Sequence, residues 1–382
     1  MVKSRWILAP PLVLVALGWL LSACGRPDAQ PTNTPVLAIS GKAGSFDNIE
    51  INQATHRLYV ADRTDQGVDV FDISKARAKY LGSIALPSSP NGLAVAPDHA
   101  RLYVGTAAGS VEVIDINPDS PALETVIAEV QTGGKSADLL DYGAARNRLY
   151  VSNGAEGMIT SIDLDTNAIK AHFNIGYPLE QPRFDPADGM VYVTSPTADA
   201  LFQIDPNDGL VKNKSTLGGC YPTGMAINPS ANSALIACKN SVLSWNLRTR
   251  QSEKFTQVAG GDVVNYAARS DQFFVGAPHQ GVVGVFGGNP IAFISAVATD
   301  GRGNSAVYDE ANDLVYSPDT RIKKAGIAGF HVPATPPAWL APLTTIAVVV
   351  VLLGVFGLLF YFIGRSADPV RRQEPASKPV AQ

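Results

Sequence analysis

The sequence predicts an all-β fold, a seven-bladed β-propeller of four-stranded blades, on three observations. A tetrapeptide that begins as Arg57-Leu58-Tyr59-Val60 returns at residues 101–104 and 148–151, and then in four weaker copies. The intervals between the seven copies are 44, 47, 42, 44, 38 and 41 residues, which is the period of a propeller blade. A second apolar segment with alternating residues follows each copy, as at residues 68–73, and turn residues separate the segments.

Each repeat is expected to supply an inner strand, the tetrapeptide strand, a third strand and an outer strand. Inner strands such as residues 93–96 carry small Ala residues, which suit the crowded centre of a ring. Third strands end in acids such as Asp72 and Asp115, which we interpret as turn-forming side chains. The seventh repeat stops after its third strand, near residue 332, whereas residues 35–39 form a strand with no repeat of its own. We therefore expect this N-terminal strand to close the last blade.

The residues after the second strand carry a resemblance to a known family. Tyr150-Val151-Ser152-Asn153 and Tyr192-Val193-Thr194-Ser195 are similar to the Tyr-Val-Thr-Asn for which the YVTN-type β-propeller repeat family is named. The resemblance extends over residues from about 36 to 332 and implies the propeller fold. Lactonases share this repeat family, but the matching residues build blades and imply no particular activity.

The N-terminus carries an export signal. Lys3 and Arg5 precede an apolar stretch, and Leu21-Ser22-Ala23-Cys24 follows it. The last four residues resemble the lipobox of bacterial lipoproteins, which implies that a signal peptide of residues 1–23 is removed and that Cys24 is lipidated. The alternative is an uncleaved signal anchor in which Cys24 has no role.

The C-terminus is expected to cross a membrane. Residues 343–364 are uncharged and apolar, and this length spans a hydrocarbon core of ~30 Å. Arginines are frequent in the tail, residues 365–382, and Lys and Arg are absent from the Pro-rich linker, residues 333–342. By the positive-inside rule the tail is cytoplasmic. A tether of residues 24–34 and a propeller of residues 35–332 would then lie on the extracytoplasmic side, in the periplasm, anchored by lipid and by one span.

Charge and cysteine content limit the kinds of partner and the state of the cysteines. The net charge of -4 and the pI near 5.8 give no basic footprint, so we expect no nucleic acid partner. If Cys24 carries lipid, only Cys220 and Cys238 remain, either as a disulfide or as two buried thiols.

One face of the ring is expected to bind a partner, because the loops from each outer strand to the next inner strand converge around the channel there. These loops are polar and mixed in sign. The candidate partner-binding residues are Lys42, Asp47, Asn91, Lys135, Asp138, Glu180, Arg183, Tyr221, Asp262 and Arg302, with His279 from a neighbouring loop. We interpret His279 as a solvated loop residue. No metal and no cofactor are expected, since a metallohydrolase would need clustered His and carboxylate ligands.

These observations favour a non-catalytic protein-binding or scaffold module. Its partner would be an extracytoplasmic or integral membrane protein, and a respiratory or photosynthetic complex is one such assembly. The alternative is a lactonase-like hydrolase that acts on a small molecule at the channel face. Fold does not decide between them. Convergent carboxylates and His around a deep pocket would favour the enzyme.

Overall fold

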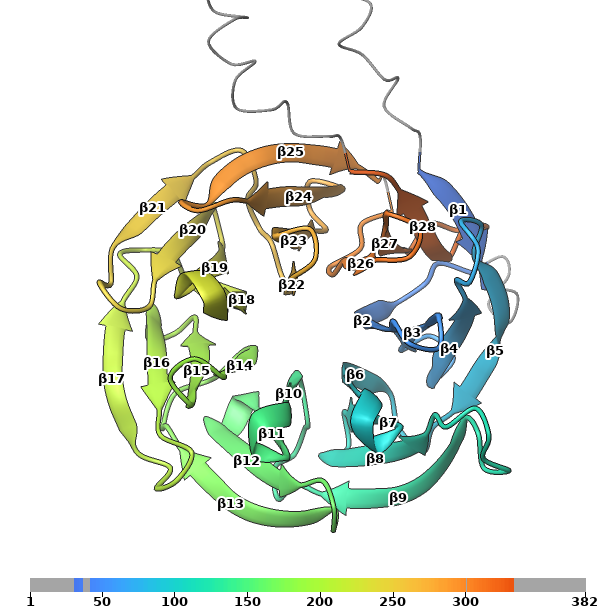
Figure 1. The fold of residues 1–382 in the computed structure, drawn as a ribbon, viewed down its shortest axis with the longest axis horizontal. Coiled ribbons are helices and arrows are strands. Elements are labelled where there is room, and N and C mark those ends of the chain that lie inside the picture. Colours follow the sequence, from blue (N-terminus) through green and yellow to red (C-terminus); the bar gives the residue numbers. More distant parts are fainter. Residues whose placement is uncertain (1–30, 37–41, 300, 333–382) are drawn as a thin grey trace, which may run out of the picture. The chain divides into compact units, whose positions relative to one another are not determined.

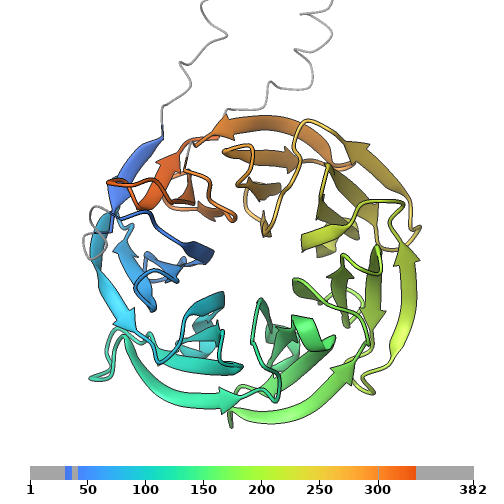
Figure 2. The same ribbon diagram turned by 180° about the vertical axis from the view of Figure 1, so that it is seen from behind.

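The computed structural model describes residues 31–36, 42–299 and 301–332. These residues form seven four-stranded antiparallel sheets arranged as blades around a central axis (Figure 1), which confirms the predicted fold class. The strands of the first six blades run in chain order from the centre to the rim (Figure 1), and Figure 2 shows the same ring from the opposite side. The one exception is the last blade, which the N-terminal strand completes.

The first four blades follow one another along the chain. Blade 1 contains β2 (Phe46–Asn52), β3 (Arg57–Asp62), β4 (Gly67–Asp72) and β5 (Lys79–Ala85). Blade 2 contains β6 (Pro90–Ala96), β7 (Arg101–Thr106), β8 (Ser110–Asp115) and β9 (Thr125–Gln131). Blade 3 contains β10 (Leu140–Gly143), β11 (Arg148–Asn153), β12 (Met158–Asp163) and β13 (Ala168–Asn174). Blade 4 contains β14 (Pro182–Asp185), β15 (Met190–Ser195), β16 (Ala200–Ile204) and β17 (Val211–Thr216).

The last three blades complete the ring. Blade 5 contains β18 (Pro222–Asn228), β19 (Ser233–Cys238), β20 (Ser241–Asn246) and β21 (Ser252–Phe255). Blade 6 contains β22 (Val264–Ala267), β23 (Gln272–Ala277), β24 (Val282–Gly287) and β25 (Ala292–Ala298). Blade 7 contains β26 (Val307–Asp309), β27 (Leu314–Asp319), β28 (Gly326–Phe330) and β1 (Thr32–Pro35). Short 3-10 helices occupy four turns, namely η1 (Pro97–His99), η2 (Ala144–Arg146), η3 (Gly154–Glu156) and η4 (Pro229–Ala231).

The repeated tetrapeptide forms the second strand of each blade, and its arginine has a structural partner. Arg148 faces Asp163 across β11 and β12, with 2.7 Å between Nη1 and Oδ2. Arg101 and Asp115 make the equivalent pair in blade 2 at 3.1 Å. Asp163 also accepts the backbone N–H of Thr166 in the following turn. The acid at the end of the third strand is therefore a turn and ion-pair residue, as predicted.

The hydrophobic core lies between neighbouring blades. In one cluster Tyr59 and Val70 of blade 1 are buried together with Leu102 and Ile114 of blade 2. Each sheet carries apolar residues on both of its faces, so every blade packs against the blade on either side of it. A Leu→Ala change in such a core costs about 2–5 kcal/mol.

An N-terminal strand closes the ring, as predicted, but it is Thr32–Pro35 and not the predicted residues 35–39. Val36 follows the strand, and residues 37–39 lie outside the described residues. Strand β1 pairs with β28 from Thr32↔Gly329 to Pro35↔Gly326, so residues assigned to the tether belong to blade 7. An outer strand needs only one buried face, so a polar segment can fill the position. Asn33 Nδ2 donates to Asp319 Oδ2 at 2.9 Å and to the Lys324 carbonyl at 2.8 Å. Val36 then enters the core between blades 7 and 1.

The membrane segments predicted from sequence lie outside the described residues. They are the signal peptide (1–23), the lipidated Cys24, the linker (333–342), the span (343–364) and the tail (365–382). Within residues 31–36, 42–299 and 301–332, no helix has the length and apolar character needed to cross a membrane.

Blade 5 contains a disulfide. The sulfur atoms of Cys220 and Cys238 are 2.01 Å apart. Cys220 lies just before β18 and Cys238 ends β19, so the bond ties the loop that enters the blade to the blade's second strand. The sequence allowed either a disulfide or two buried thiols, and the structure contains the disulfide.

Candidate binding site in the central channel

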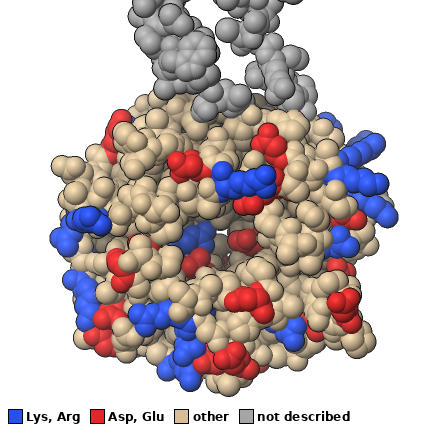
Figure 3. Space-filling model, viewed as in Figure 1, with Lys and Arg blue, Asp and Glu red and all other residues tan. Residues whose placement is uncertain are grey.

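The ring surrounds an open channel whose wall carries acidic and basic side chains (Figure 3). At one end the chain passes from each outer strand to the next inner strand. We call this end the channel mouth and define it by residues that lie at, or just before, the start of an inner strand or in a neighbouring loop. They are Asp47, Arg63, Asn91, Asp138, Glu180, Asp262 and Asn304. Equivalent positions in successive blades meet here because the blades share one axis.

Hydrogen bonds and ion pairs link the channel mouth across four blades. Arg63 forms an ion pair with Asp47 and donates from Nη2 to Asn91 Oδ1 at 2.7 Å. Asn304 Nδ2 donates to Asp47 Oδ1 at 3.0 Å and to Asp262 Oδ2 at 3.3 Å. Blades 6, 7, 1 and 2 are therefore connected by an ion pair and by hydrogen bonds of uncharged amides.

Burial and mutual repulsion raise the pKa values of the mouth carboxyls. Burial raises the pKa of Asp47 to about 7, although the Arg63 guanidinium acts against this. Burial, reinforced by the negative charges of Asp262, Asp138 and Asp47, raises the pKa of Glu180 to about 8. The pKa values of Asp138 and Asp262 are also raised by burial. Near neutral pH the mouth therefore holds protonated and ionised carboxyls together.

A second polar group lies further along the channel. We call it the deep layer and define it as Glu50, Asp141, Arg183 and Asn265. Arg183 donates to Asp141 Oδ1 at 3.1 Å, to Asn265 Oδ1 at 3.1 Å, and to the carbonyls of Met225 and Val264, both at 3.0 Å. Its side chain is only 14% exposed. One guanidinium thus joins blade 4 to blades 3, 5 and 6.

Burial raises the pKa values of the two acids in the deep layer. The pKa of Glu50 is raised to about 7, and the positive charge of Arg183 limits this rise. The pKa of Asp141 is raised by burial and lowered by Arg183 and by the Phe184 N–H, which donates to its carboxylate. Arg183 therefore stabilises the ionised form of both acids.

The structure brings together five of the eleven predicted residues at the channel mouth. These are Asp47, Asn91, Asp138, Glu180 and Asp262. The others that were expected on this face include five exposed loop residues, namely Lys42, Lys135, Tyr221, His279 and Arg302. Arg183 differs from both groups, because Pro182 already begins β14 and the next side chain lies in the deep layer. It makes contacts inside the ring and is not a loop residue.

Sequence reasoning missed Arg63, Glu50 and Asp141. Arg63 lies in the loop between the second and third strands of blade 1, beside the loops that carry the predicted residues. The deep-layer residues share a pattern in the sequence, because each pairs with the third residue of a tetrapeptide. Glu50 faces Tyr59, and Asp141 faces Tyr150. Arg183 and Asn265 occupy the same register position in blades 4 and 6.

The described residues contain no group of three or more His, Cys, Asp or Glu side chains placed to hold a metal ion. The carboxyls of the channel mouth lie on different blades, and Arg63 and Asn304 contact them directly. Protonated and ionised carboxyls, one arginine and two amides can bind a polar molecule or exchange a proton with it.

Comparisons with known proteins agree with this architecture. The model of the family "Lactonase, 7-bladed beta-propeller" matches residues 49–175, which span blades 1 to 3. No curated protein matches the chain in sequence. The chain is therefore a seven-bladed β-propeller with a partial likeness to the lactonase propellers.

Two solved structures are similar in fold. Hydrazine synthase of Kuenenia stuttgartiensis has a TM-score of 0.66 at 14% identity, over 82% of this chain and 100% of that chain. A chain of a mitotic checkpoint complex has a TM-score of 0.64 at 12% identity, over 81% of this chain and 93% of that chain. Identities this low show a common fold and carry no information about activity.

Proposed function

We propose that this chain is a non-catalytic binding propeller that docks an extracytoplasmic or integral membrane protein on the loops around its channel mouth. The observation that carries this proposal is a separation of charge. The mouth acids are recessed, and Asp47 and Asp262 contact Arg63 or Asn304. On the surrounding loops, exposed cations outnumber the exposed acids Asp65 and Glu156. We define the mouth rim as the exposed residues Lys42, Lys135, Tyr221, Lys239, His279, Arg302, Lys323 and Lys324.

The cations of the mouth rim are free to contact a partner. Within the described residues, none of its Lys or Arg side chains forms an ion pair. Tyr221 is 54% exposed, and its backbone N–H donates to Asp199 Oδ1 at 2.7 Å, which fixes its position. Tyr and Arg are the residues that most often dominate interface energies. A protein with an acidic, partly aromatic or apolar surface would complement this rim.

The proposed location is the outer side of a cytoplasmic membrane, with a lipid on Cys24 and a span at residues 343–364. Two observations support it. The disulfide between Cys220 and Cys238 suits an oxidising compartment. The pairing of Thr32 with Gly329 brings the two ends of the propeller together at one edge of blade 7, so a tether and a linker could reach the same membrane.

The binding proposal is tested by co-purification of the full chain from its native membranes in mild detergent, with mass spectrometry of the bound proteins. Arg302→Ala, Tyr221→Ala and Lys135→Ala should each reduce recovery of the same partner, and raised salt should do so as well. Lys254→Ala is the matched control, because Lys254 is an exposed lysine on the outer strand β21. An unchanged set of bound proteins in all three rim variants would overturn the proposal.

The anchor proposal has its own test. Wild-type chain should incorporate labelled palmitate, and Cys24→Ala should not. The variant should remain in the membrane fraction because of the predicted span. Detection of Met1 in the intact mass of the native protein would rule out the lipidated form.

A second candidate is a lactonase-like hydrolase at the channel mouth, and two observations favour it. Carboxyls converge there with pKa values that burial raises to about 7 for Asp47 and about 8 for Glu180, which is the range that suits acid–base catalysis. The lactonase family model also matches residues 49–175. The test is a screen of lactone and ester substrates with Glu180→Gln, Asp47→Asn and His279→Ala. Turnover that disappears in one of these variants would replace the binding proposal with the enzyme.

A further inference from the structure

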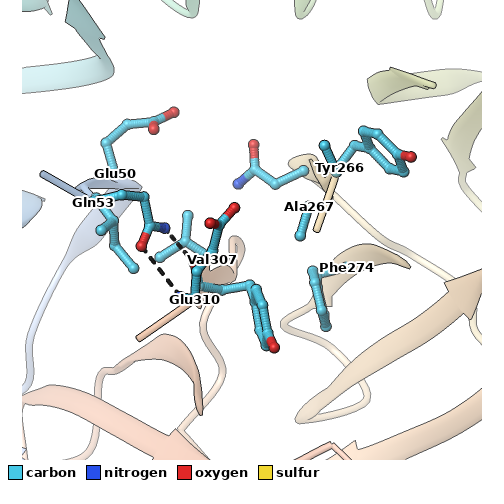
Figure 4. Close-up of a pocket in the computed structure, with 11 residues that line it drawn as sticks. Glu50, Gln53, Tyr266, Ala267, Phe274, Val307 and Glu310 are labelled. Carbon is cyan, nitrogen blue, oxygen red and sulfur yellow. Dashed lines mark hydrogen bonds between the residues drawn. The ribbon is translucent and has the colours of Figure 1, made fainter. Parts of the chain in front are cut away.

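The channel has a cavity at the end opposite the mouth. Its volume is about 310 Å³, and it lies among blades 6, 7 and 1 (Figure 4). The residues that matter here are Glu50, Gln53, Asn265, Phe274, Tyr308 and Glu310. A volume of this order is at the lower end of the range of small-molecule sites. No residue of the mouth rim contributes to this cavity.

One side of the cavity is acidic. Figure 4 shows the carboxylates of Glu50 and Glu310 directed into the same open space from blades 1 and 7. Gln53 fixes the two blades against each other, because its Nε2 donates to the Tyr308 carbonyl at 2.6 Å and its Oε1 accepts the Glu310 N–H at 3.2 Å. Among the described residues neither carboxylate accepts a hydrogen bond, so both can still accept one from a ligand.

The other side of the cavity is apolar and aromatic. Phe274 and Tyr308 stack with their ring centroids 6.0 Å apart and their planes at 10°. Phe274 itself is fully buried and supports the ring of Tyr308 from behind. Tyr308 and the exposed Ala268 therefore present the hydrocarbon that a ligand can contact. The ring of Tyr266 points away from the cavity (Figure 4), and its hydroxyl donates to Asp271 at 2.9 Å. A ligand would therefore meet two acids at one end and hydrocarbon at the other.

We propose that this cavity binds a small primary alkylammonium ion, with the ammonium group between Glu50 and Glu310 and the alkyl chain against Tyr308 and Ala268. An ammonium group has three donors and no acceptor, which matches two carboxylates that lack donors. The short alkyl chain gains by leaving water, at about 0.8 kcal/mol per buried CH₂ group. Asn265 is not needed as a ligand, since its Oδ1 already accepts from Arg183 and its Nδ2 donates to the Ala306 carbonyl.

The site should bind more tightly as pH rises. Burial, with a smaller contribution from the charge of Asp141, raises the pKa of Glu50 to about 7, and the charge of Arg183 acts against both. Glu310 also faces Glu50 across the cavity. A bound cation favours ionised Glu50, so binding releases a proton below this pKa. Affinity for the cation should increase about tenfold between pH 6 and pH 8.

The test is calorimetric titration of the full chain in detergent at pH 8 with n-butylammonium chloride. Butan-1-ol has a similar shape without the charge, butyrate has the opposite charge, and potassium chloride supplies the same ionic strength. We expect saturable binding of butylammonium alone, with affinity about tenfold weaker at pH 6. Equal binding of butan-1-ol, displacement by equimolar potassium, or no heat of binding up to millimolar butylammonium would each overturn the proposal.

Substitutions in the cavity lining test whether butylammonium binds in this cavity. Glu50→Gln and Glu310→Gln should each weaken binding at least tenfold, whereas Glu253→Gln, an exposed acid on the outer strand β21, should leave it unchanged. Ala268→Leu narrows the cavity from an exposed lining position without altering either acid, and it should also weaken binding. Affinity unchanged in Ala268→Leu and in both glutamate variants would place any binding elsewhere. Because the mouth rim is intact in these variants, this result does not depend on the docking partner.

Discussion

The channel contains two arginines among buried acids, and they are used in opposite ways. Arg63 at the channel mouth has a side chain that is 39% exposed and contacts Asp47, Asn91 and the Pro90 carbonyl. Arg183 in the deep layer is 14% exposed and donates four hydrogen bonds to three other blades. Arg183 therefore fixes the ring from inside, whereas Arg63 keeps part of its side chain in contact with water.

The difference follows from the number of neighbours that each position offers. Arg183 lies on an inner strand, where carbonyls and acids of adjacent blades surround it, so each donor finds an acceptor. Arg63 lies on a loop, where water provides part of its solvation. A guanidinium in the first setting is costly to remove, because Asp141 would remain buried without a counter-charge. In the second setting Asp47 is buried as well, but it keeps the hydrogen bond from Asn304, and its pKa of about 7 allows it to take up a proton.

The largest expected effect is that of Arg183→Ala. The variant leaves Asp141 without its ion pair and two carbonyls without a donor, so we expect the free energy of unfolding to fall by about 3–5 kcal/mol. Urea unfolding at pH 7.5 measures it. Arg183→Lys should recover part of the loss, since it restores charge without the planar fork. A loss below about 1 kcal/mol in Arg183→Ala would contradict the structural role of the deep layer.

The next effect concerns pH at the mouth. Burial raises the pKa of Glu180 from an ordinary value of 4.5 to about 8, so between these values the folded chain keeps a proton that the unfolded chain has lost. Stability due to this group therefore falls as pH rises from about 5 to 8. Glu180→Gln cannot ionise, and we expect it to gain about 1–2 kcal/mol over wild type at pH 8.5 relative to pH 5.5. Parallel urea curves for both proteins at both pH values would show no such gain if the prediction is wrong.

A smaller effect is expected for Arg63→Ala. Arg63 is itself 39% exposed, and Asp47 can take up a proton once the arginine is gone, so we expect stability to fall by only about 0.5–1 kcal/mol at pH 7.5. The pKa of Asp47 should also rise further, because the positive charge of Arg63 lowers it more than the hydrogen bond from Asn304 does. Urea unfolding and the NMR titration of the Asp47 carboxyl test the two parts. A destabilisation as large as that of Arg183→Ala would remove the distinction between the two regions.

The smallest effect on stability is expected for Arg302→Ala. Arg302 is exposed on the mouth rim, and surface changes of this kind usually alter stability by less than about 0.5 kcal/mol. A thermal melt of the variant should match that of wild type, while recovery of the docking partner falls. A clear drop in melting temperature would show that Arg302 supports the loop that carries it.

The fold was predictable because the information for it is local and repeated. The tetrapeptide specifies a buried second strand, and the acid about fifteen residues later pairs with its arginine, as Arg148 does with Asp163. The start of β1 was harder to predict, because the apolar run after Pro35 resembles a strand more than the polar segment Thr32–Pro35 does. Tertiary hydrogen bonds of Asn33 to Asp319 and Lys324 determine the register.

The candidate site was only partly predictable, because its contacts join residues far apart in sequence. Asn304 and Asp47 are separated by 257 residues and meet only when the ring is closed. Blade periodicity correctly predicted that Asp138, Glu180 and Asp262 occupy equivalent loops. It could not show that Arg183 lies one position too far along its strand to reach the surface, since a shift of one or two residues decides whether a side chain faces the loop or the channel.

Ring closure by β1 also determines when the protein can finish folding. Asn33 donates to the carbonyl of Ile327, 294 residues later in the chain. At a synthesis rate of ~5–20 residues per second, about 15–60 s pass between the synthesis of β1 and that of its partner β28. Blade 7 is the last to form, and until then blade 1 has no neighbour on one side. We expect the newly made chain to be most vulnerable to proteases and to incorrect strand pairing at the junction between blades 7 and 1.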